Sequence, residues 1–199
     1  MATWNSRGLR GSALEEYINR TCEQYREKGL ALIQKVPTPI TPVRIDQESR
    51  HITLAYFEKK STVDYIGAVQ GIPVCFDAKE CACDSFPLQN IHEHHVAFMR
   101  DFEKQQGIAF LILYFSHRDE IYYMPFWQVE QFWERGQNGG IKHFKYSELF
   151  PQWFLKRSGN ILFRFWRESR WIWMREQNRN GENFLTNEKL QNILKIEAK

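Results

Sequence analysis

Three charged residues in the first half of the chain have the types and spacing needed for metal-dependent hydrolysis. Asp77 and Lys79 are two apart in residues 72–80, a stretch of β-branched and aromatic residues. Side chains alternate along a strand, so both would point to one face if this stretch is a strand. Asp64 precedes a short apolar run that can pair with it as a hairpin, with a turn at residues 70–71. Two carboxylates and an ammonium group would then share one space.

The chemistry that this set predicts is phosphodiester hydrolysis. Aspartate oxygens suit Mg²⁺, which keeps several of its waters when a protein binds it. A lysine beside the metal can orient the attacking water or offset the charge that develops on the phosphate. A tripeptide of the form Asp-x-Lys is common by chance, however, so the rest of the chain has to support the prediction.

Length and composition indicate a single domain, whose α/β class follows from the elements and the resemblance described below. The chain has 199 residues, of which 43% are hydrophobic, and this is enough for one core. Its net charge of +3 is too small to indicate nucleic-acid binding by itself. The N-terminus lacks the apolar core of a signal peptide, and residues 108–115, the longest apolar run, are too few to span a bilayer. We therefore expect a cytoplasmic protein with no membrane partner.

The elements around these residues follow from periodicity and breaker residues. Residues 12–29 predict a first helix, and residues 30–36 a strand inside the sheet. The prolines of residues 37–42 interrupt the pattern and predict an extended ribbon that projects from the core, the stalk of residues 37–60. A helix is expected over residues 88–106. Two strands, residues 108–115 and 120–125, and a short aromatic-rich helix around Trp127 and Trp133 are expected to follow it.

Four motifs occur in one order and together resemble a known family. They are Ser61-Thr-Val-Asp-Tyr65, Phe76-Asp-Ala-Lys-Glu80, Ser85-Phe-Pro-Leu-Gln-Asn90 and Gly107-Ile-Ala-Phe110. From about residue 11 to about residue 144 the chain resembles the RecU-type Holliday junction resolvases of the PD-(D/E)xK nuclease superfamily. The resemblance implies a central mixed β-sheet flanked by helices, the restriction-endonuclease-like core, with a protruding β stalk.

The resemblance also implies roles for individual residues. Asp64 and Asp77 would bind Mg²⁺, with Mn²⁺ as a possible substitute, and the Ala78 carbonyl would complete the shell. Lys79 would activate water or stabilise the transition state. Glu15 has two interpretations: a capping residue that bonds back to the Ser12 amide, or a further metal ligand. On the next helix, Gln89 is the candidate for orienting the lysine or the water.

Two positions depart from the family pattern. Asp77 stands where RecU-type enzymes usually carry Glu, and the shorter side chain would change the position of the metal. His95 stands where Gln is expected. A single histidine on a half-apolar helix face is more often part of the hydrogen-bonded structure than a catalytic base, and the sequence assigns His95 no partner.

DNA contacts are expected at the stalk and at the N-terminus. In RecU-type enzymes the stalk enters the centre of the junction, which would bring Arg44, Arg50, Lys59 and Lys60 to the DNA backbone. The alternative is a surface hairpin with ordinary solvated charges. Arg7 and Arg10, in a flexible basic head of residues 1–11, either touch phosphates or form a solvated tail.

The expected activity is resolution of four-way DNA junctions by paired nicks in recombination and repair. Paired cuts imply a two-fold symmetric homodimer, and the family suggests a branch-migration motor and a recombinase as further partners. A basic and aromatic extension of residues 154–199 either contacts DNA or packs on a partner subunit. Two alternatives stay open: a PD-(D/E)xK nuclease that cuts ordinary duplex, and a junction-binding protein without catalysis.

Overall fold

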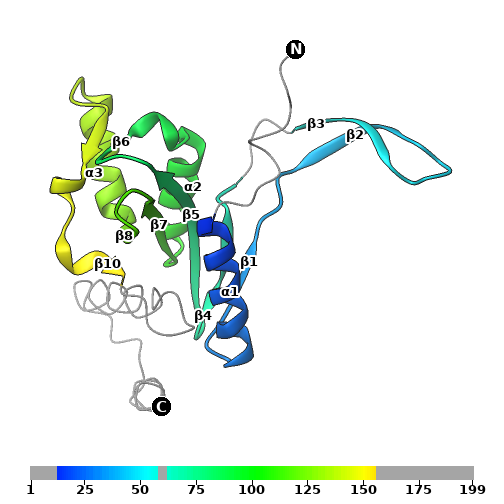
Figure 1. Cartoon of the computed structure of the whole chain (residues 1–199), viewed down its shortest axis with the longest axis horizontal. Helices are drawn as coiled ribbons and strands as arrows, with labels where there is room; N and C mark the ends of the chain where they lie inside the picture. Colours follow the sequence, from blue (N-terminus) through cyan, green and yellow to red (C-terminus); the bar gives the residue numbers. More distant parts are fainter. Residues whose placement is uncertain (1–12, 58–61, 156–199) are drawn as a thin grey trace. The chain divides into compact units, whose positions relative to one another are not determined.

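The computed structural model describes residues 13–57 and 62–155 (Figure 1). The chain divides into two units, Met1–Arg164 and Phe165–Lys199, and all described residues belong to the first. Within them the order of elements is α1 (Ala13–Glu27), β1 (Ala31–Lys35), β2 (Ile40–Ile45), β3 (Ile52–Phe57), β4 (Tyr65–Val69), β5 (Ile72–Cys81), β6 (Ser85–Pro87), η1 (Leu88–Asn90), α2 (Glu93–Lys104), β7 (Ile108–Phe115), β8 (Glu120–Pro125), α3 (Phe126–Gln137), β9 (His143–Lys145), η2 (Tyr146–Glu148), η3 (Pro151–Trp153) and β10 (Phe154–Leu155).

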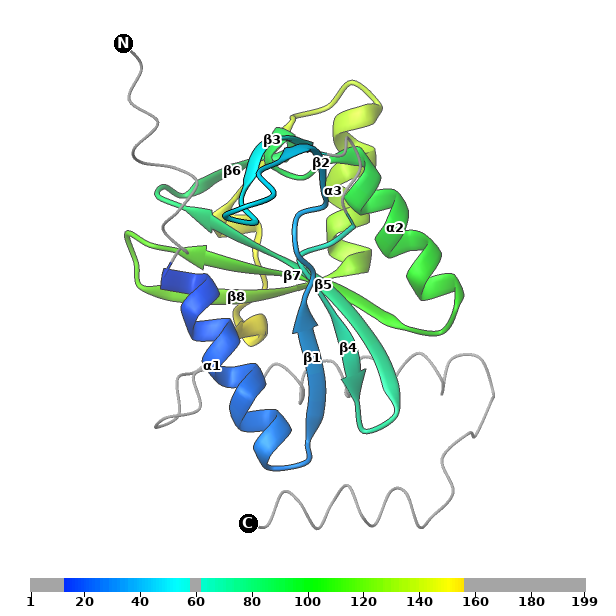
Figure 2. The same ribbon diagram turned by 90° about the vertical axis from the view of Figure 1, so that its right-hand side faces the viewer.

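A six-stranded mixed sheet forms the centre of the fold, in the order β1-β4-β5-β7-β8-β10. Only β5 and β7 are parallel, and α2 makes the crossover between them (Figure 2). The other neighbours in this sheet are antiparallel. Seven of the eight residues of β7 are buried, because helices cover both faces of the sheet at its centre, and this explains its continuous apolar sequence.

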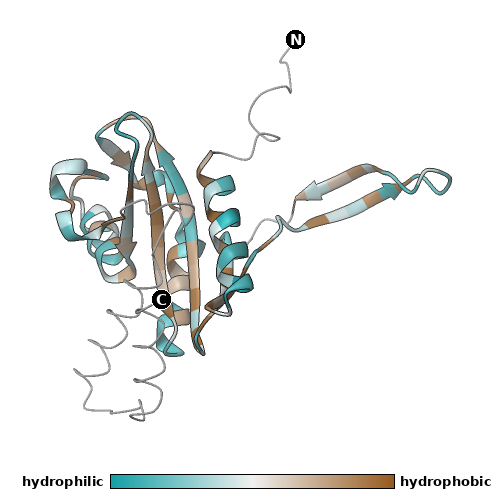
Figure 3. Ribbon diagram, turned by 60° about the horizontal axis from the view of Figure 1, so that its bottom comes forward, coloured by the Kyte–Doolittle hydropathy of each residue, from teal (hydrophilic) through white to brown (hydrophobic). Residues whose placement is uncertain are grey.

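Helices lie on both faces of this sheet. Figures 1 and 3 show α1 on one face and α2 with α3 on the other. The buried residues of α1 are spaced for one helix face, namely Leu14, Ile18, Cys22 and Tyr25. Gly29 ends this helix in the left-handed region at φ 64°, where the Leu30 amide donates to the Tyr25 carbonyl. The predicted α/β fold with a mixed sheet is therefore confirmed.

A row of stacked aromatic rings crosses four strands on the α1 face. Tyr65, Phe76, Phe110 and Tyr123 stack in succession with centroid separations of 4.7, 4.6 and 4.5 Å. The Tyr65 hydroxyl donates to Asn19 of α1 at 3.0 Å. Because Phe76 points to α1, the next residue of β5, Asp77, points to the opposite face. The row therefore fixes the register that places Asp77 and Lys79 on the α2 side.

The predicted stalk is a two-stranded antiparallel hairpin of β2 and β3 that extends away from the central sheet (Figure 1). Every residue of β3 is exposed, and all of β2 is exposed or half-buried. The Asp46 carboxylate closes the hairpin turn by accepting the amides of Glu48 and Ser49 at 2.9 Å each. The extended ribbon predicted from the prolines is confirmed for its described part.

The predicted helix of residues 88–106 is wrong in its first turn. The structure has a short 3-10 turn, η1, and a separate helix, α2, with extended backbone at Ile91 and His92 between them. Ile91 turns into the core, where it is 2% exposed, and its amide donates to the Leu88 carbonyl three residues before it, as in a 3-10 turn. Tertiary contacts therefore override a continuous helical pattern.

No helix among residues 13–57 and 62–155 is long and apolar enough to cross a membrane. The basic and aromatic extension falls almost entirely outside the described residues. Its first two residues form β10, which pairs antiparallel with β8.

Candidate functional site

Asp64, Asp77 and Lys79 converge where β4 and β5 lie side by side. The Lys79 ammonium is 3.3 Å from Oδ2 of Asp77 and 3.5 Å from Oδ2 of Asp64. The two carboxylates therefore face one cation, as the period of β5 and the β4–β5 hairpin predict. Gln70 and Gly71 form the turn of that hairpin with positive φ angles of 49° and 86°, as expected for a two-residue connection between twisted strands.

Backbone amides hold the two carboxylates from opposite strands. The Asp64 amide donates to Oδ1 of Asp77 at 2.8 Å, and the Ala78 amide donates to Oδ2 of Asp64 at 3.0 Å. Each strand thus supplies the donor that orients the other strand's aspartate. Because these donors belong to the backbone, strand pairing holds one oxygen of each carboxylate in place.

His95 is the residue of this site to which the sequence assigned no role. Its Nδ1 lies 2.5 Å from Oδ2 of Asp77, and its side chain is buried. The Asp77 side chain has no exposed surface, so it needs polar partners on every side. The sequence signals were the position of His95 on the buried face of the helix and the Gln expected there, but neither identifies Asp77 as its partner.

The electrostatics of the pair favour an ionised Asp77. Burial raises the pKa of Asp64 above its usual value, and the nearby charge of Asp77 adds to this rise. Burial also acts to raise the pKa of Asp77, but the His95 hydrogen bond and the Lys79 charge outweigh it, and the pKa lies below its usual value. Asp64 is thus the carboxylate of the pair that takes up a proton first on acidification.

The donor set fits a divalent cation with oxygen ligands. Carboxylate oxygens from two aspartates already surround a positive charge, that of Lys79. Among the described residues no group of three or more His, Cys, Asp or Glu side chains is arranged to hold a metal by itself. Carboxylate oxygens are the ligands that hard divalent cations prefer in proteins.

Glu15 forms an ion pair with Lys35, whereas Asp64 and Asp77 face Lys79. Its Oε2 lies 2.6 Å from the Lys35 ammonium, at the end of β1. Lys35 is paired with Tyr65 across the β1–β4 ladder, and the amide of the next residue, Val36, donates to the Asp64 carbonyl at 2.8 Å. Glu15 and Lys35 therefore lie on the α1 side of the sheet, next to the start of β4 and the preceding residue Asp64. The capping partner Ser12 lies outside the described residues.

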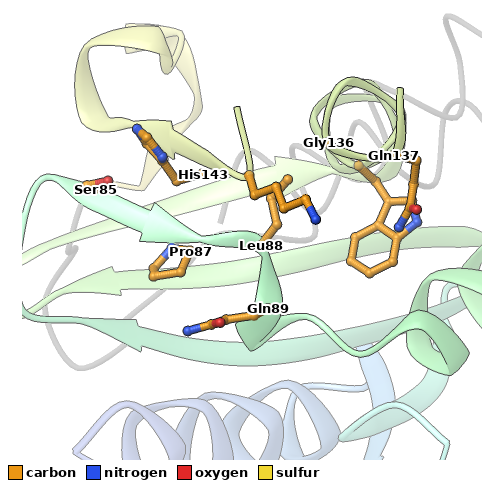
Figure 4. A pocket seen from close by; sticks show the side chains of 9 residues that line it. Ser85, Pro87, Leu88, Gln89, Gly136, Gln137 and His143 are labelled. Carbon is orange, nitrogen blue, oxygen red and sulfur yellow. The ribbon is translucent and has the colours of Figure 1, made fainter. Parts of the chain in front are cut away.

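Gln89 has an exposed side chain on η1, and no hydrogen bond in the described part of the chain joins it to Asp64, Asp77 or Lys79. It lines a cavity of about 380 Å³ between η1, α3 and β9 (Figure 4). Further residues of that cavity are Pro87, Leu88, Trp133, Gly136, Gln137, Lys142 and His143. The orienting role of Gln89 stays a prediction, whereas the polar contact from α2 to the site comes from His95.

Two of the predicted DNA contacts can be placed. Arg44 lies on β2 at an irregularity in the ladder, and Arg50 lies beside the hairpin turn with φ 56°; both are exposed. The other four predicted contacts, Arg7, Arg10, Lys59 and Lys60, lie outside the described residues.

A mixed sheet flanked by helices, with two aspartates and a lysine on adjacent strands, is the architecture of the restriction-endonuclease-like class. The chain matches the model of the family RecU, Recombination protein U, over residues 9–167. This chain belongs to the RecU family, as its motifs predict.

Relatives named Holliday junction resolvase RecU are similar over most of the chain. The relative from Geobacillus sp. (strain WCH70) is 41% identical over 146 residues, covering 71% of this chain and 73% of that one. The relative from Pediococcus pentosaceus is 42% identical over 149 residues, covering 73% and 74%. Among solved structures, a Holliday junction resolvase from Archaeoglobus fulgidus matches with a TM-score of 0.37 and 9% identity, covering 56% of this chain and 76% of that chain.

Proposed function

We propose that this protein is a structure-selective endodeoxyribonuclease that resolves four-way DNA junctions by paired, metal-dependent nicks in recombination and repair. The observation that carries the proposal is the convergence of Asp64, Asp77 and Lys79 on adjacent strands. The membership of the RecU family, with relatives named as junction resolvases, supports the substrate. We place its action in the cytoplasm, on the DNA of the nucleoid.

The two carboxylates would hold Mg²⁺, or Mn²⁺ in its place, with the Ala78 carbonyl as a further ligand. Glu15, beside the end of β1, is the candidate for an additional contact, direct or through water. When bound there, a divalent cation supplies Lewis-acid activation of the phosphate and a water with a lowered pKa. The backbone donors on Asp64 and Asp77 keep their oxygens oriented without further reorganisation.

Lys79 would act on the reacting groups. Its ammonium lies between the carboxylates and is partly exposed, so it can reach a water or a phosphate oxygen placed beside them. A positive charge at this position favours an attacking water that is losing its proton and stabilises the added charge of the pentacoordinate phosphate. Water attacks phosphorus and the 3′ oxygen leaves, so the product carries a 5′-phosphate.

The hairpin of β2 and β3 would select the four-way junction. It exposes large apolar side chains on a ribbon that stands away from the core, among them Val43, Leu54 and Phe57 at 59%, 53% and 69% exposure. Figure 3 shows hydrophobic and hydrophilic positions interspersed along the ribbon. The open centre of a junction offers the unstacked faces of its central base pairs to apolar side chains and phosphates to Arg44 and Arg50.

Two coordinated cuts need two sites, so we propose a homodimer whose two-fold axis coincides with that of the junction. A single active site in this chain can nick one strand only. Association with a branch-migration motor and a recombinase stays a prediction from the family resemblance.

The test is cleavage of a mobile four-way junction, a linear duplex and a three-way fork in Mg²⁺, with wild-type protein and Asp77→Ala. We expect symmetric nicks in the four-way junction that the variant fails to make although it still binds the junction. Equal cutting of the linear duplex would identify a general nuclease. Tight junction binding without cleavage in either Mg²⁺ or Mn²⁺ would identify a non-catalytic binding protein.

A further inference from the structure

His95 of α2 reaches the most buried charged group of the site. Its side chain is 5% exposed, the Asp77 side chain is 0% exposed, and Nδ1 lies 2.5 Å from Oδ2. The separation of 18 residues means that this contact joins two elements, α2 and β5. An aspartate with no access to water depends on such contacts for its orientation as well as its charge.

The contacts of Asp77 divide between its two oxygens. Oδ1 accepts the Asp64 amide, whereas Oδ2 faces both His95 and Lys79. The amide restrains rotation of the carboxylate about the bond to its β-carbon through Oδ1 only. The His95 contact adds a second restraint at Oδ2, the oxygen that also faces Lys79.

The imidazole ring is itself held in place. The His94 ring packs against it edge-on, with centroids 4.4 Å apart and an interplanar angle of 81°. Its neighbours on α2, Val96 and Met99, are buried. Because Oδ2 of an ionised carboxylate only accepts, the Nδ1 atom carries the hydrogen of this contact. The opposite nitrogen, Nε2, is buried and has no hydrogen-bond partner among the described residues, so the hydrogen bonding of the ring there is directed to Asp77.

We propose that His95 is a positioning residue that sets the metal affinity of the site by fixing the Asp77 carboxylate. The proposal rests on the metal-dependent nuclease function proposed above. It assigns His95 no contact with substrate and no proton transfer. A partner that orients a metal-binding side chain typically changes metal affinity by about 10- to 100-fold when it is removed.

The variants separate the hydrogen bond from the packing. In His95→Asn the side-chain amide nitrogen can occupy the position of Nδ1 and keep the donor. His95→Leu fills much of the volume but has no donor. His92→Leu is the matched control, because His92 is an exposed histidine of the same segment whose ring packs against the His94 and His95 rings and not against Asp77.

Two measurements are made on the full-length variants. The first is Mn²⁺ binding to the protein alone by isothermal titration calorimetry, which does not depend on activity. The second is the Mg²⁺ concentration that gives half-maximal junction cleavage, determined separately from the rate at saturating Mg²⁺. We expect at least about tenfold weaker Mn²⁺ binding and a matching rise in the half-maximal Mg²⁺ concentration for His95→Leu, with the saturated rate largely retained. His95→Asn and His92→Leu should stay within about threefold of wild type.

Wild-type metal affinity in His95→Leu, with wild-type protein that binds Mn²⁺ and cuts junctions, would overturn the positioning role and leave the proposed function intact. A loss of saturated rate that no Mg²⁺ concentration restores would overturn it as well, since it would make His95 part of the chemistry. If His95→Leu does not fold, His95→Asn decides alone. A Mn²⁺ affinity within about threefold of wild type then supports the role of the retained donor, and an affinity more than tenfold below wild type overturns it. Wild-type protein that neither binds Mn²⁺ nor cuts junctions would instead refute the proposed function.

Discussion

At the scale of single residues, the site is built from reciprocal contacts between two aspartates. The Asp64 amide donates a hydrogen bond to the Asp77 carboxylate, and the Ala78 amide donates one to the Asp64 carboxylate. Lys79 neutralises part of the charge that these carboxylates bring together. Two buried carboxylates repel each other, and a nearby cation offsets that repulsion. The arrangement is therefore prepared for a divalent cation before one arrives.

Replacing Lys79 by Met should reduce junction cleavage by at least about 100-fold, because it removes a positive charge from the place where negative charge develops. Junction binding should change little, since the side chain is mostly buried beside the carboxylates. Single-turnover cleavage and filter binding on the same junction measure the two effects. Lys104→Met, which removes an exposed lysine of α2 paired with Asp101, serves as the control. Cleavage by Lys79→Met within threefold of the control would contradict the assigned role.

At the scale of elements, the site depends on how closely β1, β4 and β5 pack. Gly67 of β4 lies against β1, where an added Cβ would meet the Leu32 carbonyl oxygen at 2.2 Å and the Ile33 Cα at 2.6 Å. Both are backbone atoms, which can make room only if the strands separate. β4 continues back to Asp64, so the position of this carboxylate depends on the β1–β4 pairing.

Gly67→Ala should therefore destabilise the protein by about 2–3 kcal/mol, the upper part of the usual range for overpacking. Urea unfolding followed by circular dichroism measures the change. Ala68→Ser, at the exposed next position of the same strand, should stay close to wild type. Equal stability of the two variants would show that β1 moves away from β4 at no cost.

The β2–β3 hairpin is the second element with a separable role. Arg44 and Arg50 are exposed on it. The double change to alanine should weaken junction binding and reduce the slope of log affinity against log salt by about 2, since each phosphate contact contributes about 0.9. Affinity measurements between low and physiological salt test this. Arg20→Ala, on the exposed face of α1 and paired with Glu16, is the control. An unchanged slope would favour a hairpin with ordinary solvated charges.

At the scale of the whole molecule, the proposed dimer predicts how the two cuts are divided. A mixed dimer of one wild-type and one Asp77→Ala subunit should nick only one of the two symmetric strands, because each subunit supplies one set of carboxylates and one lysine. Differently tagged subunits can be co-purified and assayed with both strands labelled. Two symmetric nicks from a mixed dimer that does not exchange subunits would contradict one site per strand.

The sequence by itself determined the features that depend on local periodicity and turn chemistry. The alternation of β5 placed Asp77 and Lys79 on one face, and residues 70–71 defined the β4–β5 turn. The apolar run of residues 108–115 became β7 with the same bounds. The four motifs between residues 61 and 110 also identified the family. These features follow from a few neighbouring residues, whose side-chain directions are fixed by the backbone repeat.

Only the tertiary structure decided which distant side chains meet. The contact of His95 with Asp77 joins a helix to a strand, and that of Glu15 with Lys35 joins another helix to the edge strand. The interruption at Ile91 likewise follows from burial of that side chain in a core that local sequence does not specify. Such contacts depend on the packing of whole elements against a sheet, and the periodicity of one segment contains no information about the segment that covers it.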